Sequence, residues 1–215
     1  MGIKKLFIFK QPTISREMEV SNKGYRYGGI IHQLQLDDFW HNLEGYEKKF
    51  IRNCAKWSFG GRVKGEDVDH HDSLVQTKRN VCSFLMGNAA WAFESKEYEL
   101  AEKLLIEVIH RSPNPCTLHR AYQKLMNIYD ALDRVNEDLL QRCKNYCKEH
   151  IKLAPALFYE SINKKHEPPE IKSFHMLKKI LQSEDDIAGY ETILLLEHQY
   201  HNGNLSIEDI NINKM

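Results

Sequence analysis

The chain has 215 residues, which is enough to bury a core without disulfides or metals, and its 42% apolar and 28% charged residues are typical of a soluble globular protein. No apolar run approaches the roughly 20 residues of a membrane-spanning helix, and the stretch LFIFK near the start is too short for a signal-peptide core. Five cysteines without a secretion signal indicate reduced thiols, so we expect a cytoplasmic protein.

The formal net charge is zero, but the charges are unevenly distributed. Residues 1–65 hold 12 Lys/Arg and 6 Asp/Glu, whereas residues 66–215 hold 18 and 24. The first segment also contains 10 of the 22 aromatic residues. Nucleic-acid-binding proteins use this composition, and so does a small subdomain whose aromatic side chains fill its own core. We interpret residues 1–65 as a partly helical N-terminal segment or subdomain and keep both roles open.

The first 35 residues mix short apolar stretches with glycines, and their fold is left open. Residues 4–10 suit either an edge strand or a docked tail. From Asp37 the pattern becomes helical, with a short helix that begins at Asp37 or Asp38 and a second helix that ends at Gly60 and Gly61. The second helix places four side chains on one face: Tyr46, Phe50, Cys54 and Trp57.

Residues 66–76 predict a polar loop, with Asp72 or Ser73 as the cap of the next helix. Carboxylates and imidazoles suit zinc, manganese or iron, and this loop holds five such side chains: Asp67, Asp69, His70, His71 and Asp72. Adjacent side chains in a loop rarely converge on one ion, and no distant partner is identifiable. We therefore predict a solvated loop with no metal and no other cofactor, and keep a metal-dependent enzyme at this loop as an alternative.

The region from 77 to 203 predicts one helix after another. The first helix runs from about residue 74 to residue 95 and is apolar on most sides, so we expect it to be buried between neighbours. Five one-sided apolar stripes follow, at residues 98–109, 118–132, 139–151, 171–181 and 187–200. Prolines end the helices near Pro113 and Pro155, and Asn202 with Gly203 ends the last helix. Antiparallel hairpins would bury these faces, so a mainly α fold is predicted.

Cys143 and Cys147 lie four residues apart and therefore share a helix face, and with His150 they form a candidate metal site. Apolar residues lie on the same side, and free cysteine behaves as a small buried apolar group. Core packing is the favoured interpretation of all three residues.

The segment AWAFESKEYELAEKLLIEVIHRSPNP joins an apolar helix, a turn, Tyr98, the small Ala101 where two helices approach, Leu105 and a closing Pro113. It resembles a tetratricopeptide repeat, and the spacing recurs at residues 118–155 and 171–203. The whole chain resembles a group of uncharacterised bacterial proteins in which an aromatic helical N-terminus precedes such repeats. This resemblance implies a right-handed stack of antiparallel helical hairpins, an α-solenoid, with a small N-terminal extension and a C-terminal tail after residue 203.

In tetratricopeptide-repeat proteins the first helix of each repeat lines a concave groove that holds a peptide. Arg, Lys, Gln and Asn are side chains that bind carboxylates and peptide backbone. The family's carboxylate clamp is not matched in full, because Gly87 and Ala90 stand where it has polar side chains. The resemblance implies these partner-binding residues, on three helices: Met86, Ala90 and Phe93; Arg120, Gln123, Asn127 and Asp130; and Lys172, His175 and Lys179.

No phosphate-binding glycine loop, G-x-S-x-G or H-E-x-x-H motif occurs in the sequence. The leading hypothesis is a non-catalytic adaptor or scaffold that binds a protein or peptide with acidic residues through its concave face. The alternative is a nucleic-acid-associated protein that uses its basic aromatic N-terminal part. Neither hypothesis involves a membrane, and the partner's identity, the pathway and the oligomeric state are left open.

Overall fold

The computed structural model describes residues 26–132, 136–206 and 208–210. Within these residues the chain is mainly α-helical and contains no strand, which confirms the prediction of a mainly α fold. The alternatives for residues 4–10 lie outside the described part. The helical elements are α1 (Gly29–Gln33), α2 (Asp37–Asn42), α3 (Gly45–Ser58), the 3₁₀ turn η1 (Glu66–Val68), α4 (Val81–Glu94), α5 (Tyr98–Arg111), α6 (Pro115–Ala131), α7 (Glu137–Ile151), α8 (Ala154–Asn163), α9 (Lys172–Ser183) and α10 (Ile187–His201).

The buried carboxylate of Asp69 connects α2 and α3. It accepts hydrogen bonds from Trp40 Nε1 at 2.8 Å and from Arg52 Nε and Nη2 at 2.9 and 2.6 Å. Helix α1 also packs tightly on this region, because Gly29 has a φ of +55° and a Cβ atom there would lie 2.1 Å from the carbonyl oxygen of Asp67. Val68 and Asp69 of the predicted polar loop are therefore part of the N-terminal core, whereas His70, His71 and Asp72 are exposed.

Helix α3 buries only part of the face that its aromatic residues suggest. Cys54 is buried and Phe50 packs against the core as predicted, whereas Tyr46 and Trp57 are exposed and Glu47, Ile51 and Ala55 are buried in their place. The buried Glu47 carboxylate is paired with Lys103 Nζ of α5 at 2.7 Å. The same carboxyl group accepts a hydrogen bond from the backbone N–H of Glu44 and so completes a capping box.

Helix α4 begins later than the predicted residue 74. Leu74 is 93% exposed, and the helix starts at Val81 behind the cap Asn80, whose side-chain oxygen accepts from Ser83 N at 2.8 Å. The preceding segment is held outside a helix by Gln33, whose side chain hydrogen-bonds the backbone N–H and C=O of Thr77. The predicted cap at Asp72 or Ser73 is therefore wrong.

The remaining stripes coincide with α5, α6, α7, α9 and α10, and α8 is the one helix after α4 that the sequence pattern does not predict. The sequence predicts that a helix stops near Pro155, which is correct for α7. However, Pro155 lies in the first turn of α8, where the missing N–H of proline costs no helical hydrogen bond. Among the described residues, no helix has both the length and the apolar composition to span a bilayer.

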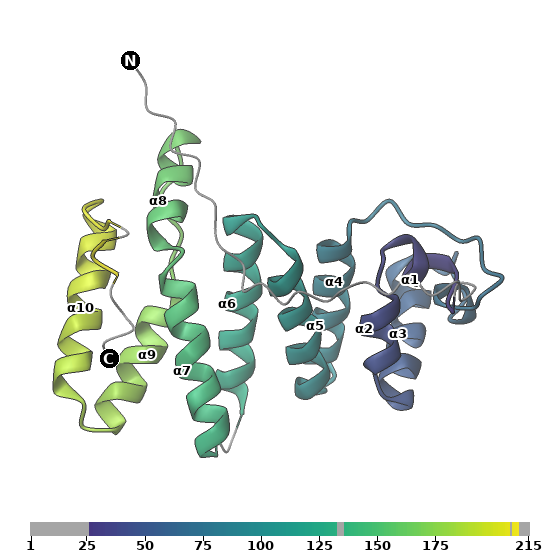
Figure 1. Ribbon diagram of the computed structural model, residues 1–215, viewed down its shortest axis with the longest axis horizontal. Helices are drawn as coiled ribbons and strands as arrows, with labels where there is room; N and C mark the ends of the chain where they lie inside the picture. Colours follow the sequence, from purple (N-terminus) through teal and green to yellow (C-terminus); the bar gives the residue numbers. More distant parts are fainter. Residues whose placement is uncertain (1–25, 133–135, 207, 211–215) are drawn as a thin grey trace, which may run out of the picture.

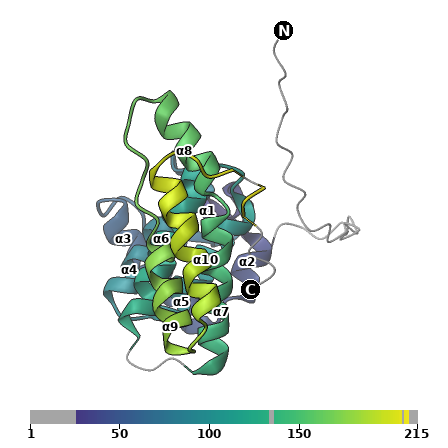
Figure 2. The ribbon, with the colours of Figure 1, turned by 90° about the vertical axis from the view of Figure 1, so that its left-hand side faces the viewer.

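Helices α4, α5, α6, α7, α9 and α10 lie side by side in one row, with the N-terminal helices at one end (Figure 1). Each of these helices contacts the next one in the row, and α6 also contacts α4 and α9. Viewed along the row, the helices overlap one another with similar axis directions (Figure 2). The buried apolar side chains of these helices and of the N-terminal helices form one continuous core cluster, whose members lie between Ile30 and Tyr200 in the sequence. Helix α6 therefore lies against both α4 and α9.

Candidate functional site

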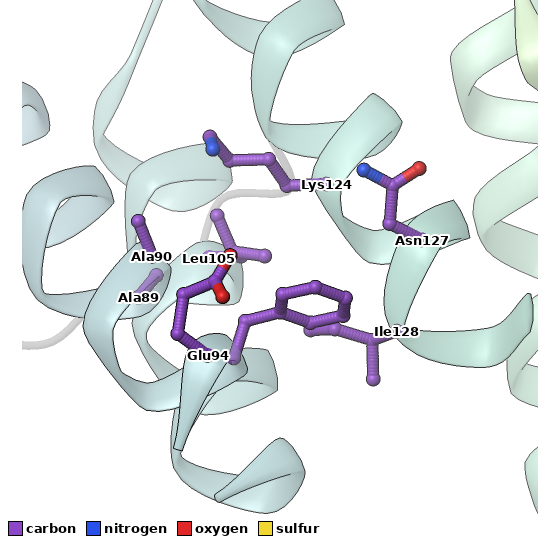
Figure 3. Close-up of a pocket in the computed structure, with 8 residues that line it drawn as sticks. Ala89, Ala90, Glu94, Leu105, Lys124, Asn127 and Ile128 are labelled. Carbon is purple, nitrogen blue, oxygen red and sulfur yellow. The ribbon is translucent and has the colours of Figure 1, made fainter. Parts of the chain in front are cut away.

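A pocket of about 140 Å³ opens between α4, α5 and α6 (Figure 3). Ala89 and Ala90 leave space that larger side chains would fill. Ala89, Leu105 and Ile128 are buried and form the apolar floor of the pocket. Glu94, Lys124 and Asn127 add polar groups. The residues that line the pocket are Ala89, Ala90, Phe93 and Glu94 of α4, Leu105 of α5, and Lys124, Asn127 and Ile128 of α6.

Asn127 belongs both to this pocket and to a polar contact with α9. Its side-chain oxygen accepts a hydrogen bond from Lys172 Nζ at 2.7 Å. Gln123, one turn earlier, accepts from the backbone N–H of Lys172 at 3.1 Å and donates to the carbonyl of Glu170 at 2.8 Å. Gln123 therefore fixes the start of α9 beside α6, and the Lys172 ammonium group is held next to Asn127.

The structure thus brings several predicted residues together and leaves others apart. Ala90, Phe93 and Asn127 share the pocket, and hydrogen bonds connect Asn127 and Gln123 with Lys172. Met86 is half-buried one turn before Ala90. The other predicted residues have exposed side chains that form no hydrogen bond or ion pair with any described residue: Arg120, Asp130, His175 and Lys179.

Lys124 is a lining residue that the sequence analysis does not identify. It lies four residues after Arg120 and three before Asn127, so helical spacing places it on the same face of α6. No ion pair engages it in the described part of the chain. Together with Lys172 and Lys179 it gives this side of the row lysine ammonium groups, against the single carboxylate of Glu94 at the pocket.

A chain of hydrogen bonds lies beneath this surface. His150 is fully buried, and its Nε2 is 2.9 Å from His119 Nδ1 while its Nδ1 is 2.8 Å from Ser173 Oγ. Burial, together with the smaller effect of the neighbouring His119, lowers the pKa of His150 to about 3, so the imidazole is neutral near pH 7. Both ring nitrogens are engaged, which leaves none for a metal. The geometry favours the core interpretation of Cys143, Cys147 and His150.

The loop at residues 67–72 offers fewer metal-binding groups than the sequence suggests. Asp69 is committed to Trp40 and Arg52. The donor atoms of His70, His71 and Asp72 lie within 4.8 Å of one another, but all three side chains are exposed. His70 Nδ1 already accepts from the backbone of Asp72, and His71 Nε2 lies 3.0 Å from the Asp72 carboxylate.

Comparison with known proteins finds no family model, no curated protein and no solved structure that matches this chain. The resemblance to tetratricopeptide repeats is therefore untested by them and stays a prediction.

Proposed function

We propose that the chain is a non-catalytic binding module that holds an extended, acidic peptide segment of a partner protein along α4, α6 and α9. The observation that carries the proposal is the position of the Lys172–Asn127 contact at the border of the apolar pocket. An apolar site and a fixed cation side by side suit a ligand with an apolar side chain and a nearby carboxylate.

The helix contacts support a tetratricopeptide-like stack, which is part of this proposal. In such a stack α4, α6 and α9 are the first helices of successive hairpins, and they contact one another through α6. Ala101 is fully buried, as the small residue at a close helix crossing has to be. This arrangement would place the pocket and Lys172 on one concave side of an adaptor or scaffold.

The size of the pocket supports a single apolar anchor. A cavity of about 150 Å³ in another protein holds a benzene-sized molecule, and the pocket here has about 140 Å³. One Leu or Phe side chain of a peptide is the matching ligand group. The half-buried Phe93 would contact it from α4, and Ile128 would contact it from α6.

The charges around the pocket support an acidic ligand. The Lys172 ammonium group has three donors, and its bond to Asn127 uses one, so two remain for a carboxylate. Lys124 and Lys179 lie on the same pair of helices and are engaged by no carboxylate within the described residues. The positive charges of these three lysines attract an acidic peptide and raise its association rate.

The test is a selection of short random peptides on the purified full chain, followed by sequencing of the bound pool. We expect enrichment of Asp and Glu together with one Leu or Phe at a fixed distance. A bound pool without acidic enrichment, or one that a variant with Lys172→Glu and Lys179→Glu retains equally, would overturn the proposal.

A further inference from the structure

Three aromatic side chains lie where the end of α3 meets α4, and none of them lines the proposed peptide pocket. Trp57 is 71% exposed and Trp91 is 44% exposed, while Phe59 is half-buried. Single exposed aromatic side chains are common on protein surfaces, but neighbouring ones form the kind of patch that marks an interaction site. We call this surface the Trp57 patch and define it by Lys56, Trp57, Phe59, Arg79 and Trp91.

Ser58 holds the Trp57 patch in a defined geometry. Its hydroxyl oxygen accepts a hydrogen bond from Trp91 Nε1 at 3.0 Å, and its carbonyl oxygen accepts one from Arg79 Nη2 at 2.9 Å. The Arg79 guanidinium carbon lies 4.7 Å from the centre of the Phe59 ring. Lys56 Nζ lies 5.7 Å from the centre of the Trp57 ring. The aromatic rings and the cations are therefore interleaved on this surface.

The surroundings of the patch are basic. Residues 48–65 contain six Lys/Arg and no Asp or Glu, and residues 73–93 contain two Lys/Arg and again no acidic residue. Arg52 is engaged by the Asp69 carboxylate. The other seven cations of these two segments form no ion pair with a carboxylate in the part of the chain that the structure describes: Lys48, Lys49, Lys56, Arg62, Lys64, Lys78 and Arg79.

We infer that the Trp57 patch is a binding site for single-stranded nucleic acid, separate from the peptide site. An unpaired base stacks on the exposed face of Trp57, and the unpaired cations around it bind the adjacent phosphates. Aromatic platforms beside cations bind single strands with little sequence preference, because every base has a stacking face. A duplex keeps its bases stacked inside and would use only the cations. The charge of the surface therefore favours a polyanion, and its exposed rings favour an unpaired one.

The test is fluorescence anisotropy of labelled oligothymidylate and oligouridylate with the full chain, with a duplex of equal length as a third probe. We expect both single strands to bind more tightly than the duplex, and the affinity to fall roughly tenfold or more between about 50 and about 200 mM salt. Trp57→Ala should weaken single-strand binding at least about fivefold, whereas Trp57→Phe, which keeps a ring, should retain most of it.

Two matched controls separate this site from other surfaces. Tyr159 on α8 is 70% exposed, so Tyr159→Ala removes an equally accessible ring and should leave oligonucleotide binding unchanged. Lys172→Glu changes a charge at the peptide site and should leave oligonucleotide binding within about twofold of the parent chain. Equal affinity of the Trp57→Ala variant and the parent chain, equal affinity for duplex and single strand, or no binding at low salt would each overturn the inference.

Discussion

Lys172 Nζ donates a hydrogen bond to Asn127 Oδ1 over 2.7 Å and so connects α9 to α6 across 45 positions of sequence. Gln123 reinforces the contact from the previous turn of α6, through the backbone N–H of Lys172. The cation at the border of the pocket is thus positioned before any ligand arrives, which reduces the ordering cost of binding.

The crossing of α5 with its neighbours is predicted to tolerate no larger side chain at position 101. Ala101 is fully buried, so Ala101→Leu should overpack the contact and lower the free energy of unfolding by roughly 1–3 kcal/mol. Thermal and urea unfolding measure this directly. Ala188→Leu on the exposed side of α10 is the matched control and should leave the midpoint unchanged. Identical midpoints for the two variants would contradict the close crossing.

The buried His150 is predicted to make the fold less stable in acid. Its pKa is lowered to about 3 in the folded chain by burial, whereas the unfolded chain binds this proton near pH 6.5. Between these values the unfolded state holds more protons, so stability falls as pH decreases, by roughly 1.4 kcal/mol per pH unit for this group. Above pH 7 both states are neutral there and the effect vanishes.

Urea unfolding of the parent chain and of His150→Gln at several pH values between 4 and 7 isolates this contribution, because the carboxylates affect both chains alike. The parent chain should lose stability more steeply than the variant as pH is lowered. The control is His175→Gln on the exposed side of α9, which should keep the steep dependence. Equal slopes for the parent chain and His150→Gln would show that His150 does not titrate with unfolding.

The Asp69 carboxylate is predicted to be the main polar support of the N-terminal part. Asp69→Ala would leave Trp40 Nε1 without its partner inside the core and would release Arg52, at a cost of about 2 kcal/mol or more. Near-ultraviolet circular dichroism and urea unfolding should both respond, since Trp40 is buried. Asp72→Ala, in the same loop but exposed, should change neither signal.

The sequence predicts most of the C-terminal helices because local sequence patterns are sufficient to define them. Apolar spacing and the prolines and glycines at the ends identify α5, α6, α7, α9 and α10. The prediction from sequence fails where a contact between distant parts of the chain determines the local structure. Glu47 is buried on α3 because it pairs with Lys103 of a distant helix, and Gln33 hydrogen-bonds Thr77 in the segment before α4. Helix α8 is missed because Pro155 serves equally as a stop and as a first-turn residue.

The candidate site follows from the sequence only in part, for a related reason. Helical spacing selects Phe93 and Asn127 on their own helices, and the structure places both in one pocket. The sequence does not show that Gln123 is occupied with the start of α9, because that contact joins segments far apart in the chain. Helical spacing also places Lys124 on the face of Arg120 and Asn127, but the repeat resemblance implies other positions as partner-binding residues.

The central claim is that a peptide binds along α4, α6 and α9, and one set of affinities tests it most directly. The selected acidic peptide is titrated into the parent chain, into Lys172→Glu with Lys179→Glu, and into Lys56→Glu with Lys64→Glu, with circular dichroism as the check of folding. Both double variants change the net charge equally, and all four lysines are exposed. The account predicts a loss of at least about tenfold for the first variant and little change for the second. Equal affinity for all three folded proteins would contradict it.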